Sequence, residues 1–360
     1  MRRAIVSDCE GPISKNDNAF ELTSNFIPNG AKLFTVISRY DDVLADILKR
    51  LDYKAGDTLK LIIPFLKAYD VTDQKMRKFS AQNIILIPNI QNTLQHVREL
   101  VHTFIVSTSY NHYIEALCQA INFSYKNTYC TKISIDKYDI AKEEKNRLKK
   151  LATEISQMSK VEVPSGAKLL NDFPEKYQKT IRRLDEIFWK EIANMKSGNF
   201  FREINTVGGS EKAEAVTDVA ERVAIDISSI MYVGDSITDV DALRLVHKKG
   251  GLAISFNGNQ YAIKNAEIAV LSENSIVTAI IADVFCRFGK REIINLVENW
   301  SLKRLQRSSV NHVLLNSFFK LYPRELPKVE IITSENMGVL AKDSGRFRKK
   351  VRGEPIGELG

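Results

Sequence analysis

Five short apolar runs, each ending in polar or glycine-rich residues, constrain the possible folds of this chain more than any other feature. They lie at residues 4–7, 104–107, 230–233, 252–256 and 268–271. Continuous apolar runs of this kind are typical of strands buried on both faces. Segments with helical periodicity separate them, at 92–100, 113–121 and 212–224. This alternation predicts an α/β fold built on a doubly wound parallel sheet, in which ligands bind at the carboxyl ends of the strands.

Two long stretches interrupt the alternation, and we expect both to be mainly helical. Residues 13–84 contain amphipathic patterns at 43–51 and 59–69. Residues 136–204 are strongly charged, and one apolar stripe recurs there at helical spacing. The stripe consists of Tyr177, Ile181, Leu184, Phe188, Ile192 and Met195. We interpret it as a packing surface rather than as a contact to a cofactor.

The last segment, residues 286–360, carries most of the net charge of +8, with 15 Lys and Arg residues against 8 Asp and Glu residues. A helical pattern at 292–305 predicts a basic helical extension, and we expect about the last dozen residues to be disordered. The basic run at 346–352 is interpreted as a solvated, mobile terminus. Its alternative is a contact with RNA or with the acidic face of a protein partner. The remainder is nearly neutral, which argues against a nucleic-acid-binding protein.

The chain has the features of a cytoplasmic protein. No apolar run approaches the roughly 20 residues that span a bilayer, and the first three residues lead directly into a strand pattern instead of a signal peptide. The four cysteines contain no CxxC pair, so we expect reduced thiols rather than disulfides or a zinc site. The five histidines form no metal-binding cluster either.

Acidic residues follow two of the predicted strands. Asp8 and Glu10 come after the first run, two residues apart, where both carboxylates can converge on one phosphate. Asp235, Asp239 and Asp241 follow the third run. Acids crowded at a strand end repel one another unless a cation binds, and hard oxygen ligands favour Mg²⁺. The pattern therefore predicts a magnesium site, with Asp241 interpreted as an acid at a helix start rather than as a ligand.

Two further positions carry groups suited to binding a phosphoryl group. Ser107 ends the second run, where its hydroxyl can hydrogen-bond a phosphoryl oxygen, and Thr108 is the alternative if the strand register shifts by one. Lys212 lies at the predicted start of a helix. A cation there can neutralise both a carboxylate and a bound phosphate. The alternative for Lys212 is an exposed surface lysine.

In this order the motifs resemble those of the haloacid dehalogenase-like (HAD) phosphatase superfamily. The family pattern is Asp-x-Asp, a strand-end Ser or Thr, a Lys, and Gly-Asp-x-x-x-Asp. It corresponds here to residues 8–10, Ser107, Lys212 and residues 234–239. Residues 252–258 and 264–266 are similar to the phosphoserine phosphatase branch. The resemblance implies an HAD-like core (1–12, 85–135 and 205–285), a C1-type helical cap (13–84), an additional helical insertion (136–204) and the basic extension (286–360).

The resemblance also implies a Mg²⁺-dependent phosphoric monoester hydrolase that acts on a small phosphorylated metabolite through an aspartyl-phosphate. Asp8 would be the nucleophile, and Glu10 would protonate the leaving oxygen and then activate water. Ser107 and Lys212 would hold the phosphoryl group. The implied metal site consists of Asp8, the main-chain carbonyl of Glu10 and Asp235, with Asp239 orienting the metal's water shell.

Glu10 departs from the family pattern, because it replaces the usual second Asp and is one methylene longer. A Glu variant is similar to a branch with homoserine phosphotransferase activity, so a phosphotransferase to an alcohol acceptor is the alternative function. Asp17 lies where phosphoserine phosphatases place a Glu that binds the substrate amine. The insertion and the basic tail resemble an archaeal energy-converting hydrogenase A subunit (R-like group). A third hypothesis is therefore a partner-binding subunit that retains the fold.

Overall fold

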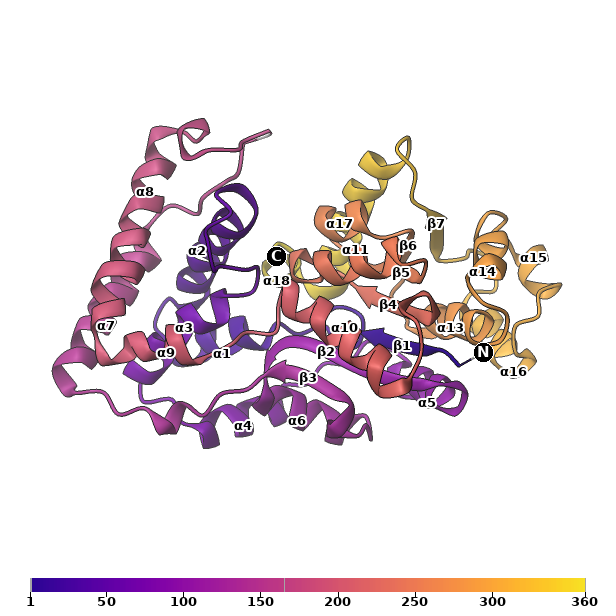
Figure 1. Cartoon of the computed structure of the whole chain (residues 1–360), viewed down its shortest axis with the longest axis horizontal. Helices are drawn as coiled ribbons and strands as arrows, with labels where there is room; N and C mark the ends of the chain where they lie inside the picture. Colours follow the sequence, from indigo (N-terminus) through magenta and orange to yellow (C-terminus); the bar gives the residue numbers. More distant parts are fainter. Residues whose placement is uncertain (1, 165, 360) are drawn as a thin grey trace.

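Seven strands form one sheet in the order β3-β2-β1-β4-β5-β6-β7 (Figure 1). The computed structural model describes residues 2–164 and 166–359. Neighbouring strands from β1 to β6 are parallel, and β7 runs antiparallel to β6. The α/β fold and its parallel sheet are therefore confirmed. The strands are β1 (Ala4–Ser7), β2 (His102–Tyr110), β3 (Thr128–Thr131), β4 (Ile230–Gly234), β5 (Leu252–Phe256), β6 (Ile268–Leu271) and β7 (Lys328–Ile331).

Helices cover both faces of the sheet. Successive strand residues point to opposite faces, so the strands pack against helices on both sides. Val6 and Tyr232 pack with α10 (Ser210–Val223) and α11 (Val240–Lys248), whereas Ile5 and Met231 pack with α13 (Ile276–Phe288) and its neighbours. Both sets of side chains are buried. The core helices are α5 (Ile90–Leu100), α6 (Asn111–Ala120), α10 (Ser210–Val223), α11 (Val240–Lys248), α12 (Gln260–Asn265) and α13 (Ile276–Phe288).

The cap and the insertion form one helical body rather than two separate units (Figure 1, left). Leu33 and Phe65 from the cap share a buried cluster with Leu151 and Phe188 from the insertion. The predicted apolar stripe belongs to this cluster, which confirms its interpretation as a packing surface. The cap helices are α1 (Asn18–Phe26), α2 (Gly30–Asp42), α3 (Thr58–Ala68) and α4 (Asp73–Gln82); those of the insertion are α7 (Lys142–Gln157), α8 (Glu175–Glu186) and α9 (Asn199–Glu203).

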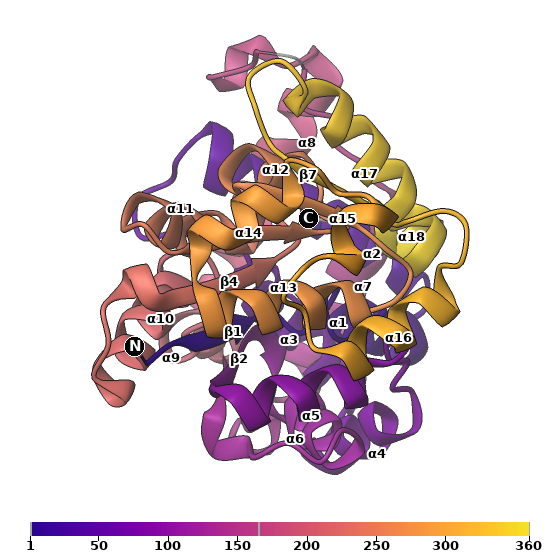
Figure 2. The same cartoon turned by 90° about the vertical axis from the view of Figure 1, so that its right-hand side faces the viewer.

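The C-terminal extension differs from its prediction in three ways. It contributes a strand, β7, to the sheet edge, and the predicted helix at 292–305 is divided into two. The expected disordered tail is wrong, because most of residues 348–359 are helical. The extension, orange to yellow in Figure 2, covers one side of the sheet. Its helices are α14 (Lys290–Val297), α15 (Leu302–Gln306), α16 (His312–Leu321), α17 (Met337–Arg352) and α18 (Glu354–Gly357).

Two of these differences, the strand β7 and the ordered tail, have physical causes. The sequence of β7 is Lys-Val-Glu-Ile, and such short, charged strands are typical of sheet edges and carry little apolar signal. The basic run of α17 contains Arg348 and Arg352, which are both buried against one acid that lies far away in the sequence, Asp235. Among the described residues, no helix combines the length and apolar character needed to cross a membrane.

Candidate active site

The register of the central strands brings three predicted site residues to one edge of the sheet. Ser7 of β1 pairs with Val233 of β4, and the amide of Asp8 donates to the Val233 carbonyl at 2.8 Å. Asp8 and Asp235 therefore emerge side by side, and Ser107 of β2 lies on the other side of β1. The register of β2 against β3 shifts beside Ser107, where a strand irregularity can re-aim a side chain.

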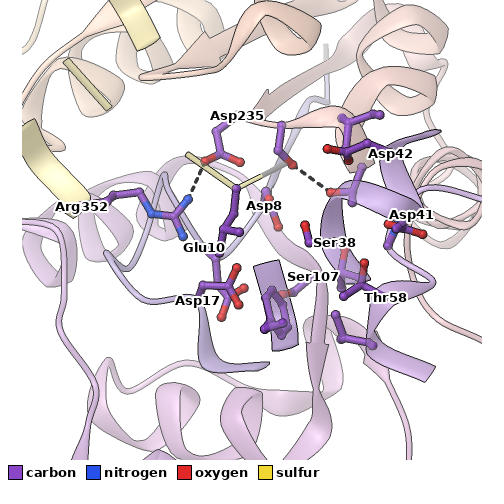
Figure 3. A pocket seen from close by; sticks show the side chains of 18 of the residues that line it. Asp8, Glu10, Asp17, Ser38, Asp41, Asp42, Thr58, Ser107, Asp235 and Arg352 are labelled. Atoms are coloured by element: carbon purple, nitrogen blue, oxygen red, sulfur yellow. Dashed lines mark hydrogen bonds and ion pairs between the residues drawn. The ribbon is translucent and has the colours of Figure 1, made fainter. Parts of the chain in front are cut away.

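A cavity of about 90 Å³ lies at these strand ends (Figure 3). The core contributes Asp8, Glu10, Ser107, Thr108 and Asp235 to its wall. Both the predicted hydroxyl of Ser107 and its alternative, Thr108, therefore reach the cavity. The cap contributes Phe34, Ser38, Asp41, Asp42, Thr58 and Leu59, and the extension contributes Arg348, Arg352 and Leu359.

Lys212 lies in the first turn of α10 and is fully buried, so its alternative as an exposed lysine is wrong. Its Nζ is 3.0 Å from Oδ1 of Asp8 and 2.8 Å from Oδ1 of Asp239. Burial alone would lower the pKa of Lys212, but the two carboxylates raise it above its usual value. The lysine is therefore a fixed cation between the predicted nucleophile and a second acid.

Asp239 is held by hydrogen bonds to both carboxylate oxygens. Oδ1 accepts from Lys212 and, at 2.7 Å, from the Tyr232 hydroxyl. Oδ2 accepts from the amides of Asp235 and Ser236 at 2.9 and 3.0 Å, and from the Ser236 hydroxyl. These donors occupy the roughly four lone-pair sites of the carboxylate. Asp239 thus fixes Lys212 and the loop after β4, and its predicted role in orienting a metal's water shell stays a prediction.

The acids at the strand ends fit a hard divalent cation. Ligand oxygens of Asp8, Asp235 and Asp239 lie within 4.8 Å of one another, and all three residues are buried. Burial, with Asp239 and Asp235, raises the pKa of Asp8 to about 8, although Lys212 acts in the opposite direction. Such mutual repulsion is relieved by a cation with oxygen ligands. Because Asp239 is already saturated, Asp8 and Asp235 are the carboxylates with room for Mg²⁺.

Two arginines that the sequence analysis missed bind Asp235. Arg348 contacts Oδ2 of Asp235 through Nη1, and Arg352 Nη1 lies 3.1 Å from the same oxygen (Figure 3 shows Arg352). The exposed fractions of Arg348 and Arg352 are 3% and 9%. A basic run near the end of a chain is usually solvated, so no signal in the sequence links them to a residue more than 100 positions earlier.

Glu10 and Asp17 lie together at the amino end of α1. Oε1 of Glu10 accepts from the Asn18 amide at 2.7 Å, and Asp17 caps the helix through the Phe20 amide at 2.9 Å. Burial and Asp17 raise the pKa of Glu10 well above its usual value, which favours a protonated carboxyl. Both side chains line the cavity, as predicted for Glu10. A role for Asp17 in amine binding stays a prediction.

Two cap acids, Asp41 and Asp42, were also missed. Both are buried on α2 and line the cavity opposite Arg352 (Figure 3). Asp42 pairs with Arg39 at 3.2 Å, while Asp41 accepts from Tyr53 at 2.6 Å and from the Gly56 amide at 3.0 Å. Adjacent acids in an amphipathic helix are usually solvated, so sequence reasoning passed over them.

The remaining predicted acid, Asp241, lies where it was expected, and a thiol lies beside Asp8. Asp241 lies in the first turn of α11, is partly exposed and is not part of the acidic cluster in the described residues. Cys9 is buried beside Asp8, and burial raises the pKa of its thiol well above the usual value. A neutral thiol is a poor nucleophile, so Cys9 is not a candidate for that role.

Comparisons with known proteins found solved structures that are similar to this chain. Gene product AF1437 from Archaeoglobus fulgidus has 25% sequence identity and a TM-score of 0.81, with 100% of this chain and 99% of that chain covered. An apo phosphoserine phosphatase has 13% identity and a TM-score of 0.43, with 76% and 96% covered. No curated protein matches the chain. The resemblance to the archaeal hydrogenase subunit stays a prediction.

A protein-family model also matches this chain. The model for haloacid dehalogenase-like hydrolases matches residues 87–283, which is more than half of the sequence. The matched segment contains Ser107, Lys212, Asp235 and Asp239, four of the predicted site residues. The chain therefore belongs to the family of haloacid dehalogenase-like hydrolases.

Proposed function

We propose that the protein is a Mg²⁺-dependent phosphatase that hydrolyses a small phosphorylated metabolite through an aspartyl-phosphate on Asp8. One observation carries the proposal. The Asp8 carboxylate opens into a cavity at a strand end, with Lys212 Nζ at 3.0 Å and Asp235 on the neighbouring strand. This is the constellation that nucleophilic attack on a phosphate ester requires.

In the first step, an Asp8 oxygen attacks phosphorus and the bond from phosphorus to the ester oxygen breaks. Lys212 and Ser107 bind phosphoryl oxygens and stabilise their charge. Glu10 supplies the proton that the leaving alcohol needs, and its raised pKa supports that role. In the second step, Glu10 takes a proton from water, which attacks the phosphoryl group and releases Asp8.

A divalent cation fits the oxygens of Asp8 and Asp235. Bound there, Mg²⁺ would neutralise the charge of the nucleophile and of the phosphate as they approach each other. The pKa of Asp8, about 8 in its buried setting, supports the need for such a cation, because attack requires the ionised carboxylate. Asp239 holds Lys212 in place during these steps.

The shape of the cavity supports a small substrate. Its volume is about 90 Å³, and cap residues such as Phe34 and Leu59 form part of its wall. A cavity of this size beneath a cap leaves no room for a folded phosphoprotein. A small metabolite, admitted when the cap opens, is the substrate class that such a site favours.

Phosphate release from p-nitrophenyl phosphate and from a panel of phosphorylated metabolites tests the proposal. We expect release that requires Mg²⁺, stops with EDTA and falls by at least about 10³ in Asp8→Asn. Asp139→Asn, which changes an exposed aspartate, is the matched control and should keep full activity. Activity that survives in Asp8→Asn would contradict the mechanism. Added alcohols that gain phosphate at the expense of water would identify a phosphotransferase instead.

A further inference from the structure

Helix α17 brings two buried guanidinium groups to the residue that would bind the metal. Arg348 Nη1 contacts both Oδ2 and, at 3.3 Å, the main-chain oxygen of Asp235. Arg352 Nη1 contacts the same Oδ2 at 3.1 Å, and its Nε donates to the Lys15 carbonyl at 3.0 Å. Within the described residues, no other cation pairs with Asp235. Oδ2 of Asp235 thus forms ion pairs with two guanidinium groups.

The helix is anchored on both sides of the cavity, so these contacts are not those of a loose tail. On the core side, the Ser344 hydroxyl donates to the Gly258 carbonyl at 2.6 Å. On the cap side, Arg39 Nη2 donates to the carbonyl of Glu358, and Lys160 of the insertion pairs with the Glu358 carboxylate at 3.0 Å. Helices α17 and α18 therefore hold the arginines in a fixed place between core and cap.

The positive charges of Arg348 and Arg352 affect how strongly Asp235 can bind a metal ion. A buried arginine is stable only when it is paired, and both arginines share Asp235 as their ion-pair partner in residues 2–164 and 166–359. A divalent ion that binds Asp235 competes with the two arginines for the negative charge of that carboxylate. It is also repelled by two guanidinium groups at short range, in a site with little water to screen them. Nε of Arg348 is buried without a hydrogen-bond partner, so the guanidinium is not fully satisfied where it lies.

We propose that Arg348 and Arg352 are built-in cationic competitors of the divalent ion at Asp235. In the free protein they neutralise the Asp235 carboxylate through its Oδ2, and they keep metal affinity low until a phosphate ester adds its negative charge. Metal and substrate then bind together rather than metal first. The inference rests on the proposed function, because it concerns the same metal site. Both arginines act through Asp235 and are therefore positioning residues.

Binding of Mn²⁺ alone, measured from the electron paramagnetic resonance signal of the free ion without substrate, tests the competition. We expect Arg348→Met to bind Mn²⁺ at least about tenfold more tightly than the wild type, because one repelling charge is gone. Arg348→Lys, which keeps the charge, should stay within about threefold of the wild type. Arg346→Met is the matched control, since Arg346 is an exposed residue of the same helix. A purely structural role for Arg348 predicts the opposite direction, with affinity lost in Arg348→Met.

Equal or weaker Mn²⁺ binding by Arg348→Met would overturn the inference. If circular dichroism shows that Arg348→Met does not fold, Arg352→Met, which removes the other guanidinium, gives a second and independent measurement of Mn²⁺ affinity. The wild-type phosphatase assay separates this failure from failure of the proposed function. If the wild type releases phosphate with Mg²⁺ but the variants bind Mn²⁺ as the wild type does, only the competition is refuted. If the wild type neither binds the ion nor releases phosphate, the proposed function is refuted as well.

Discussion

Two sets of cations face the acids of this site, and they come from different parts of the molecule. Lys212 belongs to the core helix α10 and bridges Asp8 and Asp239. Arg348 and Arg352 belong to the extension and bind Asp235. The family model includes Lys212 but ends before the arginines. The comparison teaches that the proposed nucleophile, Asp8, contacts a cation of the matched core, whereas the candidate metal ligand, Asp235, contacts cations of a segment outside that match.

Removing Lys212 should have the largest effect. Lys212→Met removes the cation that the buried carboxylates of Asp8 and Asp239 share, which costs about 3–5 kcal/mol of unfolding free energy. Phosphate release should fall by about 10²–10³, because the transferring group loses its cation. Urea unfolding and the phosphate assay measure the two effects. Lys248→Met, at an exposed site, is the control; a Lys212→Met variant as stable and active as this control would refute the role of the core cation.

Substitution of one glycine in the core and one in the extension should change the stability of the protein in opposite directions. Gly11 has φ +115°, and an added Cβ would lie 2.0 Å from Oδ2 of Asp235. Gly11→Ala should therefore cost about 1–3 kcal/mol from backbone strain alone, with further loss from the collision. Gly345 of α17 has open space around its Cβ position, so Gly345→Ala should stabilise the protein by about 0.5–1 kcal/mol. Thermal unfolding compares them, and destabilisation by both would argue against an ordered α17.

The hydroxyl of Tyr232 gives a smaller effect on the core side. Tyr232→Phe removes one donor to Asp239 but leaves Lys212 in place. The loss of a buried hydrogen bond to a charged group costs about 1.5–2 kcal/mol. Tyr129→Phe removes a hydroxyl that donates to an exposed partner, Asp218, and should change stability by less than about 0.5 kcal/mol. Equal effects from the two changes in urea unfolding would show that the network around Asp239 is unimportant.

The smallest effect concerns the anchor of the extension. Hydrogen bonds from Lys349 and Lys160 lower the pKa of Glu358 to about 2. A carboxyl with a lowered folded-state pKa stabilises the protein above its unfolded pKa of about 4.5, and this contribution is lost as pH falls towards 2. Because Glu358 is 39% exposed, solvent screening keeps the effect below about 1 kcal/mol. Glu358→Gln should thus differ from wild type in urea unfolding at pH 7 but not near pH 2; a difference that grows at low pH would contradict the assignment.

The core of the site was predictable because its residues follow strands with a clear apolar pattern. The runs at β1, β5 and β6 match the observed strands in full, and parallel register then forces Asp8 and Asp235 together. The strand β3 was missed because its sequence, Thr-Tyr-Cys-Thr, is not an apolar run. An apolar run followed by an acid predicts the position of a side chain correctly where a few neighbouring residues determine that position.

The rest of the site depends on contacts between distant segments, which a pattern along the sequence does not encode. Arg348 meets Asp235 across 113 positions, and its basic neighbours have the composition of a solvated tail. Asp41 is buried at a cavity wall that cap and core residues form together. Charged residues predict exposure in general, so their burial at a site is the feature that sequence reasoning misses most easily.

Covalent labelling of Asp8 tests the central claim most directly. Acid quenching of the protein during turnover of p-nitrophenyl phosphate with Mg²⁺, followed by mass spectrometry of the peptide containing Asp8, measures the intermediate. We expect one phosphoryl group on Asp8, absent from Asp8→Asn and unchanged in Asp139→Asn. Phosphate release with no phosphoryl group on Asp8, or with the group on another residue, would contradict the account.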